Sequence, residues 1–76
     1  MAILVDFAQV REDDTQVEYA FGLDGRMDRR LVVDKATEQA TPRDGGRDIS
    51  FSGALRKILE GRRRLGRWPQ QGTYAA

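Results

Sequence analysis

Apolar and polar side chains alternate through the first half of the chain. This period of two is typical of strands with one buried face, and it recurs over residues 2–10, 16–21 and 28–34. The apolar side chains that share the predicted buried face are Ile3, Val5, Phe7, Val17, Tyr19, Phe21, Leu31 and Val33. A polar stretch over residues 38–41 is compatible with a short fourth strand at an edge. Pro42 would end it, because proline cannot donate to a ladder.

Turn-forming residues separate these segments. Arg11-Glu12-Asp13-Asp14 is a polar turn, and Lys35-Ala36-Thr37 is a second tight reversal. Asp24-Gly25 lies between two alternating runs, which is a strong hairpin signal because Gly25 adopts a positive φ without a steric penalty. Turn signals spaced about 8–12 residues apart favour an antiparallel meander.

The period changes from two to that of a helix after residue 49. Apolar residues there recur at i, i+4, i+7, i+8 and i+14, and they are Phe51, Leu55, Ile58, Leu59 and Leu65. Ser50 or Ser52 is predicted to cap the first turn through its hydroxyl. Gly66 is a predicted left-handed stop, and Pro69 prevents the helix from continuing.

These elements predict a small α+β domain, with a three- or four-stranded antiparallel meander covered on one face by a single C-terminal helix. The 76 residues suffice for one domain. Residues 1–42 are predicted to form the sheet, residues 43–49 a loop, residues 50–66 the helix and residues 67–76 an irregular tail.

Composition removes several kinds of chemistry. The chain has no cysteine and no histidine, so it lacks disulfides, thiolate metal sites, the commonest general base and the commonest metal ligand. We therefore expect no catalytic, cofactor-binding or metal-binding residues and no enzyme activity. An alternative enzyme or ligand site would use Asp6, Arg30 and Asp34, if the strands place them together on the uncovered face of the sheet.

The sequence also bears on location. No apolar run approaches the roughly 18 residues that span a membrane. The apolar start, MAILVDFAQV, lacks the basic region of a signal peptide. We therefore expect a cytoplasmic protein without a membrane partner.

Charge is distributed unevenly along the chain. Residues 1–50 carry seven basic and eleven acidic side chains, whereas residues 51–76 carry six basic and one acidic. Eleven of the thirteen basic residues are arginine, which suits phosphate or carboxylate recognition but also follows from arginine-rich codon usage. The candidate contact residues for a partner are Arg56, Arg62, Arg63, Arg64, Arg67 and Trp68.

Three interpretations of this basic end remain open. It could contact a protein partner or a second copy of the chain, and an edge strand could pair as well. It could bind nucleic acid, with phosphates on the arginines and bases stacked on Trp68. It could also be a solvated helix end, with Trp68 folded back onto the core. We expect a non-enzymatic protein-interaction or self-associating domain, with nucleic-acid binding as the alternative.

Two short motifs carry a resemblance. Val33-Asp34-Lys35-Ala36 and Trp68-Pro69-x-x-Gly72, together with the acidic hairpin start, resemble a family of small uncharacterised actinobacterial proteins. The likeness spans most of the chain, and it implies no activity, cofactor or site, because the function of that family is unknown.

Overall fold

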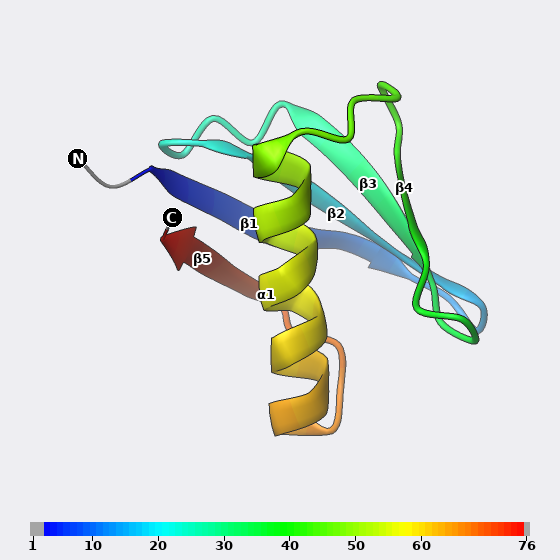
Figure 1. Cartoon of the computed structure of the whole chain (residues 1–76). Coiled ribbons are helices and arrows are strands. Elements are labelled where there is room, and N and C mark those ends of the chain that lie inside the picture. The colour runs from blue at the N-terminus through cyan, green and yellow to red at the C-terminus, as the bar shows by residue number, and fades with distance from the viewer. Residues whose placement is uncertain (1–2, 76) are drawn as a thin grey trace.

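The structure is a computed structural model that describes residues 3–75, so Ala2 at the predicted strand start and Ala76 at the end of the predicted tail lie outside the described residues. The elements are β1 (Leu4–Glu12), β2 (Gln16–Leu23), β3 (Arg29–Asp34), β4 (Ala40–Pro42), α1 (Ile49–Leu65) and β5 (Gln71–Ala75). The strands form one antiparallel sheet in the order β4-β3-β2-β1-β5, and α1 crosses one face of it (Figure 1).

The prediction of an α+β fold with an antiparallel sheet and one C-terminal helix is confirmed. The predicted count of three or four strands is wrong, because the segment predicted as an irregular tail supplies β5. This strand returns from the helix and pairs with β1, at the opposite edge of the sheet from β4. Pairing with a strand almost seventy residues away stabilises it, and local periodicity does not report such a pairing.

The predicted hairpin turn forms at Asp24 and Gly25, whose φ angles are 52° and 81°. The Arg26 amide donates to the Leu23 carbonyl at 2.9 Å, which closes the turn. The chain then passes closely over Gly22, where any Cβ would collide with the Arg26 carbonyl. The connection between β2 and β3 is therefore longer than the tight hairpin that the sequence predicts.

The core confirms the alternation in the strands, except at Ile3, which is exposed. Its buried side chains are Val5, Phe7, Val17, Tyr19, Phe21, Leu31, Val33, Ala40, Phe51, Ala54, Ile58 and Trp68. Leu55 and Leu59 pack against this cluster, but Leu65 remains 46% exposed although its spacing places it on the apolar stripe. Its exposure follows from the last turns of α1, which project beyond the strands (Figure 1).

Both ends of α1 have identifiable caps. Asp48, rather than Ser50 or Ser52, is the N-cap, because its carboxylate accepts a hydrogen bond from the Phe51 amide at 3.0 Å. The serine prediction was wrong since the helix begins earlier, at Ile49, and Ser50 is buried in its first turn. The C-terminal prediction is confirmed: Gly66 is left-handed, and its amide donates to the Arg62 carbonyl.

Two glycines let α1 approach the C-terminal segment closely. A Cβ on Gly53 would lie 2.5 Å from the Tyr74 ring, and one on Gly61 would lie 3.0 Å from Pro69. As α1 advances from Gly53 to Gly61, the segment beneath it runs backwards from Tyr74 to Pro69. The helix therefore crosses the C-terminal segment with the opposite chain direction, and it contacts this segment at both Gly53 and Gly61.

Candidate functional site

The predicted basic end divides into a buried and an exposed part. Trp68 is only 7% exposed and belongs to the core, and the Arg62 guanidinium lies 5.6 Å from the centre of its ring. The next residue, Pro69, accepts a hydrogen bond from the Tyr19 hydroxyl at 2.7 Å. Trp68 thus holds the segment between α1 and β5 in place, and its buried ring is not available for stacking on a base.

The other candidate arginines lie on the surface. Arg63 and Arg64 are exposed in the last turn of α1, Arg67 follows the helix, and Arg56 lies two turns earlier. None of them forms an ion pair with another residue in the described part of the chain, whereas Lys57 pairs with Glu60 at 3.4 Å. These exposed arginines give this end of the molecule an uncompensated positive charge.

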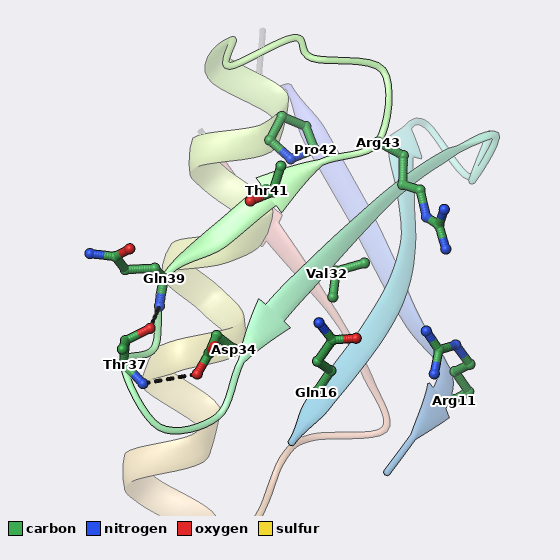
Figure 2. Close-up of a pocket in the computed structure, with 9 residues that line it drawn as sticks. All are labelled: Arg11, Gln16, Val32, Asp34, Thr37, Gln39, Thr41, Pro42 and Arg43. Atoms are coloured by element: carbon green, nitrogen blue, oxygen red, sulfur yellow. Dashed lines mark hydrogen bonds between the residues drawn. The ribbon is translucent and has the colours of Figure 1, made fainter. Parts of the chain in front are cut away.

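The face of the sheet opposite α1 holds a hollow of about 620 Å³ (Figure 2). The side chains that line it are Arg11, Gln16, Val32, Asp34, Thr37, Gln39, Thr41, Pro42 and Arg43. Figure 2 shows α1 on the far side of the sheet and the two arginines on the right of the hollow. Asp34 is used locally, since its Oδ1 accepts from the amides of Ala36 and Thr37.

The two arginines of the hollow share one carboxylate. Glu18 is only 6% exposed, and its Oε1 accepts from Arg11 Nε at 3.0 Å and from Arg43 Nη2 at 3.4 Å. Burial raises the pKa of the Glu18 carboxyl, but the bonds and charges of the two arginines outweigh burial and hold the pKa below its usual range. Glu18 is therefore ionised at neutral pH, and its carboxylate pairs with both arginines of the hollow.

The alternative site at Asp6, Arg30 and Asp34 is not assembled. All three side chains lie on the open face, but the register places Asp6 opposite Gly22 and Asp34 opposite Gln16. Six residues of β2 separate those two positions, which is about 20 Å along a strand. Asp6 instead accepts a hydrogen bond from the Thr73 hydroxyl at 2.6 Å.

The edge at β4 is closed to further strands. The bonds from Arg43 N to Arg30 O and from Asp34 N to Gln39 O set the register, so Ala40 and Pro42 turn their backbone groups outward. Pro42 has no amide hydrogen, and its carbonyl accepts from Gly45 N at 3.1 Å. The Ala40 carbonyl accepts from Arg47 at 3.3 Å. Only the Ala40 amide is left to bind another chain.

An arginine holds the loop that closes this edge. Arg29 donates to the Asp44 carboxylate at 2.7 Å, to both oxygens of Asp48 at 2.9 Å and to the Gly46 carbonyl at 2.9 Å. Its hydrogen bonds, with that of the Gly46 amide, hold the pKa of Asp44 at about 2, and Arg29 also keeps the pKa of Asp48 below its usual range. Its guanidinium lies 4.7 Å above the centre of the Phe21 ring. The sequence analysis missed this network, because it joins residues from separate turns.

The edge at β5 is open. Its register with β1, continued by the bond from Gln9 N to Gln70 O, directs the backbone groups of Gly72 and Tyr74 toward β1. Gln71, Thr73 and Ala75 therefore direct theirs away from the sheet. Within residues 3–75, no hydrogen bond reaches these outward groups. The signal that could have found this edge is the pair Thr73 and Tyr74, which favour strands.

No family model, curated protein or solved structure matches the chain. The resemblance to actinobacterial proteins thus stays a prediction. In the part that the structure describes, no helix is long and apolar enough to cross a membrane, and no group of three acidic side chains is arranged to hold a metal ion.

Proposed function

We propose that this domain is a non-enzymatic protein-interaction domain that takes an extended segment of another polypeptide onto the edge of β5. The observation that carries the proposal is the row of outward backbone groups on Gln71, Thr73 and Ala75. Three outward amides and three outward carbonyls are the donors and acceptors that an added strand requires. Location in the cytoplasm stays a prediction.

The composition of the edge supports the proposal. β5 reads QGTYA, so it contains none of the charges, prolines or bulges that protect edge strands from pairing. Its inner face is fixed by the contact of Tyr74 with Gly53, and by Phe7, whose ring fills the space where a Gly72 side chain would lie. A strand held rigidly on one side presents its free side at a lower entropic cost of binding.

Selection from a library of random heptapeptides displayed on phage tests this function. We expect peptides that bind the wild-type domain but not Thr73→Pro, since proline removes one outward donor and is tolerated where the amide points away from the sheet. Thr73→Val is the matched control, because it removes the hydroxyl that bonds Asp6 and keeps the amide. Peptides that bind the proline variant equally well, or no selected peptides, would refute strand addition at β5.

Nucleic-acid binding by the arginine-rich end of α1 is the second candidate. Arg63, Arg64 and Arg67 favour it, because they are exposed and form no ion pair within residues 3–75. The burial of Trp68 removes the stacking platform that it would use. Titration of labelled oligonucleotides at two salt concentrations tests it, because affinity should fall by about 0.9 log unit per phosphate contact per log unit of salt. Alanine at Arg63, Arg64 and Arg67 should abolish binding, and Arg62 should be left intact because it packs on Trp68.

A further inference from the structure

We infer that the segment taken up by β5 is acidic, with carboxylates at alternate positions that face α1. This inference rests on the proposed function and names the chemistry of its partner. Its basis is the side of the helix that lies next to the open edge. Two close approaches identify this side of the helix: Gly53 lies against Tyr74, and Gly61 lies against Pro69.

Residues three and four apart share one side of a helix. Lys57 lies four residues from both Gly53 and Gly61, and Arg64 lies three residues after Gly61, so both face the β5 side. Arg56 and Glu60 belong to the next row outward. The opposite side of α1 faces β2, where Phe51 contacts Phe21 at 6.3 Å between ring centres. We call the residues Arg56, Lys57, Glu60 and Arg64 the helix flank. It carries three positive charges and one negative charge.

The flank reaches over the open edge. Because α1 crosses β5 and its last turns project beyond the strands (Figure 1), the outward side chains of its C-terminal half lie near the position that a sixth strand would occupy, about 4.8 Å beyond β5. β5 itself contributes no charge. The charge that an incoming strand meets on this face is therefore the net positive charge of the flank.

The register of β5 specifies which side chains of the partner would meet it. Partner residues opposite Gln71, Thr73 and Ala75 would form the backbone hydrogen bonds and direct their side chains to the open face. Partner residues opposite Gly72 and Tyr74 would direct theirs toward α1. Two carboxylates two residues apart therefore match the flank.

A second copy of the chain fits this edge less well. Head-to-tail pairing of β5 with β4 is blocked, since Pro42 has no amide hydrogen and the outward carbonyls are occupied. Antiparallel pairing of two β5 strands would place both helices on the same face of the joined sheet. Their flanks would then face each other, with like net charge on both sides.

Fluorescence anisotropy with designed peptides tests the inference. The probe is a labelled peptide of sequence Thr-Glu-Val-Glu-Thr-Glu-Val, and its counterpart has lysine in place of each glutamate. At low salt we expect the acidic peptide to bind about tenfold more tightly than the basic one, a difference that two or three exposed ion pairs can supply. The difference should shrink at high salt, because exposed charges are screened.

Charge reversal on the flank completes the test. Lys57→Glu with Arg64→Glu should reverse the preference between the two peptides. Arg30→Glu, the same change on the opposite face, should leave the preference unchanged. Thr73→Pro should abolish binding of both peptides.

The outcomes separate this inference from the proposed function. Equal binding of the two peptides that Thr73→Pro still abolishes would overturn the acidic partner and leave strand addition standing. A concentration-dependent dimer in sedimentation that Thr73→Pro dissociates would also overturn the acidic partner and leave strand addition standing. The added strand would then come from a second copy of the chain. Preference for the acidic peptide that survives Thr73→Pro would refute strand addition at β5, and the inference with it. Displacement of the acidic peptide by an oligonucleotide whose own binding survives Thr73→Pro would assign the flank to nucleic acid and overturn the inference.

Discussion

The two edges of this sheet differ in what they leave exposed. At β4, proline removes one outward donor, and Gly45 and Arg47 occupy the two outward carbonyls. At β5, the outward groups of Gln71, Thr73 and Ala75 have no partner in the part of the chain that the structure describes. The outward backbone groups at β4 are therefore too few to pair with another strand, whereas those at β5 are free to do so.

The difference shows that the open edge is not a general property of this small sheet. Six residues maintain the closed edge, and they are Arg29, Pro42, Asp44, Gly45, Arg47 and Asp48. Arginine and aspartate are common elsewhere in the sequence, but β5 contains neither of them and no proline. An edge that lacks protection in a protein that protects its other edge is the stronger candidate for pairing.

Removal of the anchor at the closed edge should have the largest effect. Arg29→Ala leaves the carboxylates of Asp44 and Asp48 without their cation and removes the contact with the Phe21 ring. We expect the free energy of unfolding to fall by about 2–3 kcal/mol, measured by urea denaturation. Arg30→Ala is the matched control, because Arg30 is exposed and forms no ion pair within residues 3–75. Equal effects of the two substitutions would show that Arg29 does not anchor the loop.

Opening the closed edge should turn the domain into an assembling one. Pro42→Val restores an outward amide, and Arg47→Ala releases the Ala40 carbonyl. The double variant then offers a β4 edge that the β5 edge of another copy can bind, and we expect its sedimenting mass to rise with concentration above that of wild type. Adding Thr73→Pro should return the mass to the wild-type value. Assembly that persists in the triple variant would locate the contact elsewhere.

The sequence predicted the parts of the fold that depend on local pattern. Alternation located the buried faces of β1, β2 and β3, and Asp24-Gly25 and Gly66 fixed two chain reversals, because positive φ is a local property. β5 was missed because its side chains carry weak alternation and it forms by pairing with β1. Leu65 was assigned to the apolar stripe but is exposed, because helical spacing reports direction and not where the sheet ends.

The candidate site was predicted less well for the same reason. The sequence located the arginines but could not show that Trp68 is buried beneath Arg62, since that contact depends on the path of the chain after Gly66. Backbone groups at an edge have no sequence signature of their own. Whether they are free follows from strand order and register, which here join residues almost seventy positions apart.

A smaller effect should separate the observed helix cap from the predicted ones. Asp48→Ala removes the acceptor of the Phe51 amide and one partner of Arg29, so we expect a loss of about 1–2 kcal/mol in the free energy of unfolding. Ser52→Ala should change it by less than about 0.5 kcal/mol, because Ser52 is exposed and caps nothing. Thermal denaturation of both variants measures the difference, and a larger loss for the serine variant would contradict the assignment of the cap.

The smallest expected effect concerns pH. The stabilisation that ionised Asp44 and Asp48 give to the closed edge should be lost in acid and unchanged near neutral pH. The pKa of Asp44 is about 2 in the folded protein, and that of Asp48 lies below its usual range, whereas the pKa of an aspartate in the unfolded chain is about 3.9. Because the folded values are the lower ones, the stabilisation is fully present above about pH 4. It should be lost as the pH falls toward about 2.

A global melting curve would mix this response with that of Asp13, whose pKa is also lowered, by hydrogen bonds from the Thr15 and Gln16 amides. Site-resolved NMR titration avoids the mixture, because the Gly46 amide reports on Asp44 and the Phe51 amide on Asp48. We expect both midpoints to move up toward the ordinary value in Arg29→Ala, while the Thr15 amide, which reports on Asp13, titrates as in wild type. An Asp44 midpoint near 4 in the wild-type protein would mean that Arg29 does not hold the loop, and the closure of the β4 edge would then depend on Pro42 and Arg47 alone.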